Sequence, residues 1–490
     1  LTPRVGRYLA RLRQAKRHPY GVSRRRSAGA QVFVMQSSGG ITTAERAARE
    51  PVRTILSGPA GGVIAARRLA DRLGIRRAIS FDMGGTSTDV CLLDGPPATT
   101  RETTLGGLPV AVPVLDVHSV GAGGGSLARL DAGGALRVGP ESAGASPGPV
   151  CYGRGGTQPT VTDAHLLLGR MDSKHFLGGE FGLDEPAARE SLEAFLRAHR
   201  RKQSEQRGGI TSVRELADGI VAVANANMEK ALRVISVERG HDPRDFSLVS
   251  FGGAGGLHAC ELARALRLAQ VIVPPNPGAF SALGVLLSDF LKDVSQSVLF
   301  PVPAGAKRAG PQAMKRCLRE IEERFELLER QARAELRDDG LPAGVASAMR
   351  SLDLRYVGQS YELAIPFTAG FREHFHRAHE QAYGYADPAR AVEVVNLRLR
   401  LTIPAAKQQF RRARPGRASH LAQTLIRRRD VWFDRKNVST PFYDRARFAP
   451  KMHFRGPAVV IEYSATTVVP PDFACRVDEF LNLVLRRHAR

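Results

Sequence analysis

A glycine-rich turn directly after an apolar strand is the feature that most limits how this chain can fold. In 81-FDMGGTSTDV-90, two aspartates enclose Gly-Gly-Thr-Ser-Thr, and the apolar residues of 75-IRRAISF-81 come directly before them. Gly84 and Gly85 let the backbone approach a ligand closely and present successive amides to it. The turn also supplies three hydroxyl groups, from Thr86, Ser87 and Thr88. Such a turn suits a phosphate group.

The two aspartates of this turn are candidate catalytic residues. Asp82, at the end of the strand, cannot bind phosphate directly, but it can hold Mg²⁺ or order a water molecule. Asp89 can do the same from the far side of the turn. A structural hairpin explains the same residues, because Asp and Gly are ordinary turn residues. The chemistry of this turn alone does not choose between the two interpretations.

A second glycine cluster favours a nucleotide. In 247-SLVSFGGAGGLHACELARAL-266, an apolar strand leads into a glycine loop and then a helix, an arrangement that receives phosphates or a nucleoside. The candidate cofactor-binding glycines of this loop are Gly252, Gly253 and Gly255. A dinucleotide site is disfavoured, because GGAGGLH lacks the GxGxxG spacing. Two such loops in one α/β region predict a nucleotide cleft.

The pattern of apolar residues divides the chain into three regions. Residues 1–298 alternate short apolar strands with helical stretches and glycine loops, which is typical of an α/β domain. Residues 299–345 form a helical connector, because residues 311–339 place apolar side chains at helical intervals between charges. Strand signals dominate residues 346–490, which predict a smaller β-rich domain.

Composition excludes several classes of protein. No apolar run reaches the roughly 18 residues that span a bilayer, and residues 1–19 lack the apolar centre of a signal peptide, so we expect a cytoplasmic protein without a membrane partner. The net charge of +23 could mark a nucleic-acid partner. The arginines, however, are spread over both ends without interleaved aromatic residues, so we expect no nucleic acid. Five scattered cysteines form no CxxC pair and are expected to be reduced thiols.

Three further polar residues are candidate ligands of a divalent metal such as Zn²⁺, with Asp82 as a fourth metal-binding candidate. His118 precedes the glycine run 121-GAGGGS-126, Asp163 lies in 160-TVTDAH-165, and His258 follows the second glycine loop. Imidazole and carboxylate groups suit such ions. The alternative is that each side chain caps or packs within its own turn, and the sequence separations decide nothing. Cys151 is expected to be a buried structural thiol rather than a nucleophile.

Segments along nearly the whole chain resemble the hydantoinase A and 5-oxoprolinase proteins, relatives of the acetone and acetophenone carboxylase subunits. Besides the two glycine loops, the matching segments are 35-MQSSGGITTAERAAREPVRTILSGPAGGV-63, 118-HSVGAGGGSLARLD-131, residues 138–170 and 457-PAVVIEY-463. The resemblance implies an actin-like (Hsp70-like, sugar-kinase-like) ATPase lobe. Residues 82–89 would then be its second phosphate loop and residues 252–256 its adenosine loop.

The resemblance also implies a chemistry and partners. ATP with Mg²⁺ would phosphorylate the carbonyl oxygen of a cyclic amide such as 5-oxoproline or a hydantoin, or of a ketone, and a hydantoinase B-type subunit would complete hydrolysis or carboxylation. A first phosphate loop of the form GxDxGGTFTD does not occur before residue 35. The chain therefore resembles the family without its first half, and we expect a separately encoded N-terminal lobe. The alternative is a truncated, non-catalytic family member that acts in binding or assembly.

Overall fold

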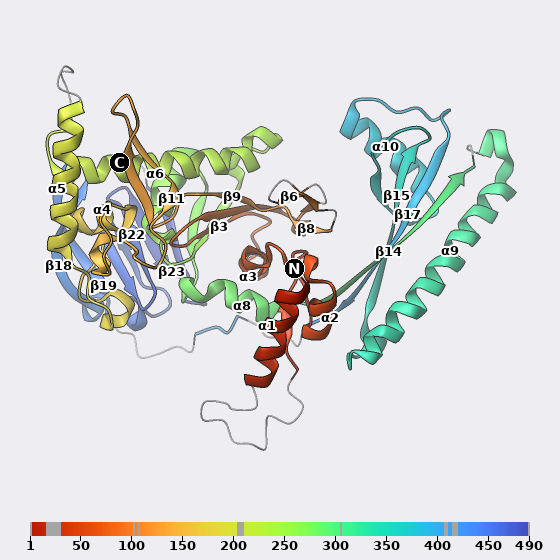
Figure 1. The fold of residues 1–490 in the computed structure, drawn as a ribbon, viewed down its shortest axis with the longest axis horizontal. Coiled ribbons are helices and arrows are strands. Elements are labelled where there is room, and N and C mark those ends of the chain that lie inside the picture. Colours follow the sequence, from red (N-terminus) through yellow and green to blue (C-terminus); the bar gives the residue numbers. More distant parts are fainter. Residues whose placement is uncertain are drawn as a thin grey trace. The chain divides into compact units, whose positions relative to one another are not determined.

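The computed structural model describes residues 2–15, 31–100, 103–105, 108–110, 112–202, 210–303, 306–405, 410–413 and 420–488. They form a mixed α/β fold, which confirms the α/β part of the prediction (Figure 1). The chain forms two compact units. Unit 1 comprises Leu1–Val34, Gly40–Pro51 and Ser288–Lys407, and unit 2 comprises Met35–Gly39, Val52–Leu287 and Gln408–Arg490.

Unit 2 is built on an eight-stranded sheet with the order β20-β23-β24-β13-β12-β3-β4-β9. At its centre, β12 runs parallel to both β3 and β13, while β4 pairs antiparallel with β3. All five residues of β12, including Ser247 and Ser250, are buried, as expected for a central strand that pairs in parallel on both sides. The strands are β3 (Arg77–Met83), β4 (Thr88–Asp94), β9 (His118–Val120), β12 (Ser247–Phe251), β13 (Gln270–Val273), β20 (His453–Arg455), β23 (Phe473–Val477) and β24 (Leu483–Arg487).

Helices surround this sheet and bury apolar faces against it. In α6, buried positions recur at helical spacing, from Leu216 through Ile220 to Ile235. The α6 helix contacts α4, α5 and α7. The helices of unit 2 are α3 (Ser57–Arg72), α4 (Val161–Leu167), α5 (Glu185–Lys202), α6 (Val213–Ile235), α7 (Gly255–Leu266) and α8 (Phe280–Leu287).

Smaller sheets complete unit 2. A four-stranded sheet of order β18-β19-β21-β22 lies in its C-terminal part, where β22 packs beside α7. Its strands are β18 (Leu425–Phe433), β19 (Lys436–Asp444), β21 (Ala458–Glu462) and β22 (Ala465–Val469). The remaining strands form three pairs: β10 (Ser126–Leu130) with β11 (Leu136–Ser142), β5 (Thr99–Thr100) with β8 (Val114–Leu115), and β6 (Thr103–Leu105) with β7 (Leu108–Val110).

Unit 1 contains a six-stranded sheet with the order β1-β2-β14-β17-β15-β16. Buried and partly exposed residues alternate along much of β17, as expected for a strand with one face in a core. The long α9 helix packs on β14 and β17 (Figure 1). The elements are α1 (Thr2–Ala15), β1 (Phe33–Met35), β2 (Ile41–Thr43), α2 (Ala44–Arg49), β14 (Phe290–Val302), α9 (Ala306–Asp338), β15 (Ser347–Tyr356), β16 (Leu363–Pro366), α10 (Phe371–Tyr383) and β17 (Val392–Ile403).

The compact units divide the chain differently from the three regions predicted by pattern. The long helix expected over residues 311–339 is confirmed as α9, but it packs within unit 1. The strand-rich residues 346–490 are shared, with β15 to β17 in unit 1 and β18 to β24 in unit 2. Sequence patterns identify strands, whereas sheet membership depends on long-range pairing. Among the described residues, no helix is long and apolar enough to cross a membrane.

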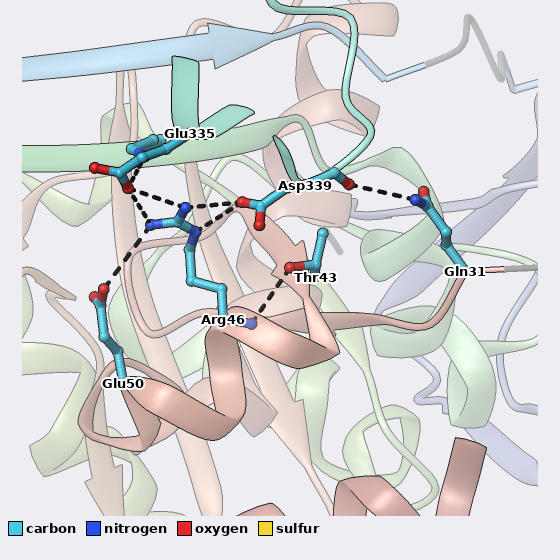
Figure 2. Close-up of polar contacts among 7 residues, drawn as sticks. Gln31, Thr43, Arg46, Glu50, Glu335 and Asp339 are labelled. Carbon is cyan, nitrogen blue, oxygen red and sulfur yellow. Dashed lines mark hydrogen bonds and ion pairs between the residues drawn. The ribbon is translucent and has the colours of Figure 1, made fainter. Parts of the chain in front are cut away.

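An arginine on α2 fastens this short helix to the end of α9. Arg46 Nε and Nη2 donate to Asp339 Oδ2 at 3.0 and 2.8 Å, and its terminal nitrogens donate to Glu335 Oε2 at 3.1 Å (Figure 2). The Arg46 amide is capped by Thr43 Oγ1 at the helix start. Lys292 of β14 is buried and contacts the same Glu335 carboxylate. These charges hold residues far apart in the sequence together within unit 1.

Arg46→Ala is expected to destabilise the contact between α2 and α9 by about 1–3 kcal/mol, because charge-assisted hydrogen bonds to the half-buried Asp339 and to Glu335 are lost. Hydrogen exchange of the backbone amides in the C-terminal half of α9 should become faster. Arg46→Lys, which keeps the charge but not the planar set of donors, should have an intermediate effect. Unchanged exchange in Arg46→Ala would contradict the role given to this arginine.

Candidate functional site

The two aspartates of the first glycine turn face each other across a hairpin. Asp82 is the second-last residue of β3 and Asp89 the second residue of β4, and the two are direct partners in the antiparallel register. Like charges in directly opposite positions destabilise a sheet. Their placement is therefore a candidate functional feature, since a bound cation would relieve the repulsion.

Burial perturbs both carboxyl groups. Desolvation raises the pKa of Asp82 to about 6, with a further increase from the charge of Asp89, while a hydrogen bond from Ser281 opposes the shift. The Ser281 hydroxyl donates to Asp82 Oδ2 at 2.9 Å. Burial also raises the pKa of Asp89, against a hydrogen bond from the Ser119 hydroxyl. Each carboxylate thus has one hydroxyl partner that stabilises its charged form.

The turn between them is tight and open on its outer side. The Gly84 amide donates to the Ser87 carbonyl oxygen at 3.1 Å, which closes the hairpin. A Cβ atom built at Gly84 or Gly85 would meet no atom within 4 Å. Gly85 and Thr86 are exposed, and Ser87 is half-buried. A ligand can therefore approach the backbone here at close range.

Thr88 does not share this exposure. Its side chain is fully buried, and its hydroxyl donates to the Ala122 carbonyl oxygen at 2.6 Å. The predicted phosphate contact from Thr88 therefore needs correction, because this hydroxyl holds the hairpin to the segment behind it. Thr86 and Ser87 are the hydroxyl-bearing residues that the turn presents.

The glycine run at residues 121–126 supports the turn from behind. The amides of Gly124 and Gly125 donate to the carbonyl oxygens of Gly84 and Gly85 at 3.0 and 2.6 Å. A Cβ atom at Gly123 would lie 2.6 Å from the Thr86 nitrogen, so a side chain does not fit. This supporting role is not apparent from the sequence, where the run only marks the position of His118.

The second glycine loop packs directly on the end of β3. Gly252 has a φ of +80°, and a Cβ atom there would lie 2.3 Å from the Met83 carbonyl oxygen and 2.5 Å from Asp82 Oδ1. The Ala254 amide donates to that same carbonyl oxygen at 3.0 Å. The two loops that the sequence predicts as one nucleotide cleft are therefore adjacent.

The glycines of the second loop have different surroundings. Gly253 is exposed, whereas Gly255 and Gly256 are buried in the first turn of α7. A Cβ atom at Gly255 would lie 2.9 Å from Ser250 Oγ, and one at Gly256 would lie 2.6 Å from the Thr466 carbonyl oxygen on β22. Gly255 was predicted to bind the cofactor. Its observed contacts are with neighbouring protein atoms.

His258 belongs to a buried polar network beneath this loop. Its Nδ1 lies 2.6 Å from Asn225 Oδ1, and its Nε2 lies 3.0 Å from His165 Nε2 on α4. Because the amide oxygen only accepts, His258 Nδ1 donates to it, and His258 Nε2 accepts from His165. Burial lowers the pKa of His258 to about 3, with help from the charge of Arg170, and lowers that of His165 well below its usual value. Sequence reasoning missed His165, whose partner is remote in the chain.

The predicted grouping of His118, Asp163 and His258 as metal ligands is not found. The described residues contain no group of three or more His, Cys, Asp or Glu side chains that could hold a metal ion. Asp163 instead caps α4, accepting the amides of Thr160 and Cys151 at 2.9 and 2.8 Å. His118 starts the edge strand β9, and His258 is engaged as described.

Cys151 is a buried free thiol, as expected. Burial raises the pKa of its thiol far above the usual range, with Asp163 as a further cause. Since the thiolate is the nucleophilic form, this environment disfavours nucleophilic chemistry.

Comparison with known proteins identifies the family. The sequence pattern described as Hydantoinase/oxoprolinase matches residues 1–294, and that of the Hydantoinase/oxoprolinase C-terminal domain matches residues 308–488. The chain belongs to the hydantoinase/oxoprolinase family. The resemblance inferred from the sequence is thus confirmed.

Family members with assigned names differ in what they act on. The chain is 33% identical to the caprolactamase subunit alpha of Pseudomonas jessenii, over 98% of this chain and 67% of the relative. It is 32% identical to 5-oxoprolinase 1 of Arabidopsis thaliana, over 92% of this chain and 36% of the relative. It is 30% identical to the acetone carboxylase beta subunit of Xanthobacter autotrophicus, over 90% of this chain and 61% of the relative. This chain therefore spans between about a third and two thirds of these relatives.

Solved structures of the family share the fold. The ATP-dependent caprolactamase from Pseudomonas jessenii superposes with a TM-score of 0.78 at 32% identity, over 100% of this chain and 69% of that chain. The nucleotide-free structure of acetone carboxylase, which carries out ATP-dependent acetone carboxylation, gives a TM-score of 0.78 at 26% identity, over 94% of this chain and 64% of that one. The fold of this chain is thus similar to those of ATP-dependent family members.

The ionised Asp82 side chain is expected to destabilise unit 2 at neutral pH. Its folded pKa of about 6 lies above its unfolded value, so the stability that the protonated form contributes at low pH is lost as the pH rises through 6. Asp82→Asn should therefore be more stable than the wild type at pH 7.5, by roughly 1–3 kcal/mol, and the gain should fall by about half at pH 5. Urea unfolding followed by the fluorescence of Trp432, the single tryptophan, reports on unit 2. Glu190→Gln, at an exposed position of α5, controls for the lost charge, and a pH-independent difference would contradict the assignment.

The buried histidine pair should give unit 2 the opposite pH dependence. Both folded pKa values lie below the unfolded value, so the unfolded state binds more protons and stability falls as the pH drops below about 6.5. The expected loss approaches about 1.4 kcal/mol per pH unit for each histidine. His258→Gln should reduce this slope in the same fluorescence measurement, whereas His453→Gln, at an exposed position, should not. Equal slopes in all three proteins would exclude the pair as the cause.

Proposed function

We propose that this chain binds ATP with Mg²⁺ and takes part in activating the carbonyl group of a cyclic amide or a ketone by phosphorylation. The observation that carries this proposal is the direct contact of the Gly252 turn with the end of β3, beside the Asp82–Asp89 pair. Two glycine turns and two opposed carboxylates thus occupy one small region of unit 2. Similarity to the ATP-dependent caprolactamase and to 5-oxoprolinase supports nucleotide use and the cyclic amide class.

Under this proposal, unit 2 is one lobe of an actin-like ATPase. Residues 82–89 act as its second phosphate loop, and residues 252–256 act as its adenosine loop. The parallel pairing of β12 with β3 supports this arrangement, because it brings the carboxyl ends of the two strands to the same edge. Ligands of α/β proteins bind characteristically at such an edge.

The Asp82–Asp89 pair fits a magnesium ion. Mg²⁺ takes oxygen ligands and is usually bound by one or two carboxylates together with substrate phosphates. Burial is the main cause of the raised pKa of both carboxyl groups, and a bound divalent cation would stabilise their charged forms. When bound, the ion would neutralise the charge that develops on the phosphoryl oxygens.

The remaining parts of the turn would bind the phosphates. The backbone at Gly84 and Gly85 is open to close approach, and the neighbouring Thr86 and Ser87 carry hydroxyl donors. Thr88 acts indirectly, since its hydroxyl fastens the hairpin to Ala122. The chain's own contribution is then positioning and preorganised donors, which provide most of the catalysis in phosphoryl transfer.

Phosphorylation would convert an inert carbonyl oxygen into part of a reactive species. Transfer of the γ-phosphoryl group to an amide or enolate oxygen forms a new P–O bond and releases ADP. We propose that a hydantoinase B-type subunit then carries out hydrolysis or carboxylation, in line with relatives that are named as subunits. A lobe with a GxDxGGTFTD loop would supply the other half of the phosphate site.

Magnesium-dependent ATP binding should require Asp82. In calorimetric titrations at pH 7.5, Asp82→Asn is expected to weaken binding of MgATP at least tenfold, which corresponds to about 1.4 kcal/mol. Because Asp82 has a pKa of about 6, wild-type binding should also weaken as the pH falls through 6. Ser281→Ala removes the hydrogen bond that opposes this shift, so it should move the midpoint to higher pH.

The same titrations contain their own control. Binding of ATP without Mg²⁺ should differ little between the wild type and Asp82→Asn, apart from reduced repulsion of the phosphates in the variant. Equal MgATP affinities in the two proteins would refute the metal role of Asp82. Binding without any phosphoryl transfer in the presence of a B-type subunit and the other lobe would favour a non-catalytic binding role.

A further inference from the structure

A cavity of about 750 Å³ lies in the C-terminal part of unit 2, beside the second glycine loop. Its wall includes the turn after β13 (Pro275 and Asn276), residues 444–447 at the end of β19, and residues 461–463 at the end of β21. A small neighbouring cavity of about 20 Å³ is lined by Gly253 and shares His175, Ile461, Glu462 and Tyr463 with the larger one. The large cavity thus shares part of its wall with a smaller one that is lined by the exposed glycine of the second loop.

The turn at residues 275–278 links this cavity to the glycine loop. The Gly252 amide donates to the Pro277 carbonyl oxygen at 3.0 Å, and the Asn276 amide donates to Glu462 Oε1 at 2.6 Å. Asn276 has a φ of +52°, a left-handed conformation that Asn adopts more readily than most residues. Its backbone is therefore fixed from both sides, and its exposed side chain lines the cavity.

The charges around the cavity are already paired, which argues against a phosphate site. Arg445 is buried and donates to Glu462 Oε2 at 2.9 Å and to the Val273 carbonyl oxygen at 2.8 Å. Arg447 pairs with Asp444 at 3.2 Å. An uncharged part of a ligand suits such surroundings better than its phosphates do.

Tyr463 offers an aromatic surface at the rim. Its side chain is 56% exposed, its hydroxyl donates to Glu180 Oε2 at 3.2 Å, and its ring lies against Gly178, where a Cβ atom would be 2.7 Å from Cδ2. The ring is therefore held in place while much of it stays accessible. Aromatic rings of this kind stack on nucleobases.

We propose that this cavity receives the nucleobase of the bound nucleotide, with Tyr463 stacking on the base and the Asn276 amide reading its edge. This inference rests on the proposed nucleotide function and adds a preference for adenine. A side-chain amide presents one acceptor and one donor, which match the N6 amino group and N7 of adenine. Base recognition would thus come from the turn after β13 together with Tyr463 of the C-terminal part of unit 2, whereas the phosphates would bind at the first glycine turn.

The test compares ligands with and without the base, using saturation-transfer NMR and calorimetry on the full chain. Wild type should bind MgATP about tenfold or more tightly than magnesium inosine triphosphate, in which an oxygen replaces the N6 amino group. Asn276→Gly should abolish this preference. Glycine suits the left-handed backbone and keeps the hydrogen bond from the backbone N–H to Glu462. Tyr463→Ala should weaken the binding of both nucleotides about tenfold. Tyr463→Phe, which keeps the ring, should change their affinities about twofold or less.

Magnesium tripolyphosphate separates failure of this inference from failure of the nucleotide function. Its binding should be unaffected by Asn276→Gly and Tyr463→Ala, and weakened by Asp82→Asn. If the Asp82 variant alone weakens MgATP, and the two cavity variants leave the ATP-to-inosine ratio and affinities unchanged, the nucleotide function stands and the base site is overturned. If wild type binds neither MgATP nor magnesium tripolyphosphate, both are overturned.

Discussion

The contact between the end of β3 and the Gly252 turn is the constraint on which the candidate site depends. The Met83 carbonyl oxygen accepts the Ala254 amide, and no side chain larger than hydrogen fits at Gly252 beside it. This close approach puts the last two residues of β3, Asp82 and Met83, next to a loop that leads into a helix. Parallel pairing of β12 with β3 makes the approach possible, because both strands end at the same edge. Neither glycine turn would form a shared site without it.

Two further layers of backbone hydrogen bonds make this edge rigid. Gly124 and Gly125 donate to the carbonyl oxygens of the first turn, and Thr162 at the start of α4 donates in turn to Gly124. The α4 helix is joined to α7 through the bond between His165 and His258. A continuous path of packed and hydrogen-bonded groups therefore connects the first glycine turn with α7, the helix that follows the second loop. The geometry at Asp82 is preorganised by residues that do not themselves face the turn.

How much the sequence could predict follows from which interactions are local. The two glycine turns were predictable because glycine is chemically required where backbone approaches backbone or a ligand. The burial of Thr88 was also within reach, since it lies two residues before buried Val90 and so shares its face of β4. The packing of Gly255 and Gly256, the partner of His258, and the division of the strand-rich C-terminal region depend on pairings between distant residues. No local pattern encodes those pairings, so the predicted metal grouping of His118, Asp163 and His258 could not be checked by spacing.

Two pairs of ionisable groups within unit 2 show how the fold separates structure from function. His165 and His258 are completely buried, share a hydrogen bond between their Nε2 atoms, and remain neutral because burial disfavours the charged form of each. Asp82 and Asp89 are only partly buried, each has one hydroxyl donor, and at neutral pH their charges oppose each other across the hairpin. The first pair lowers its energy by excluding protons and solvent. The second pair retains a repulsion between its carboxylates that a bound cation would relieve. This relief would favour cation binding beside the open side of the first glycine turn.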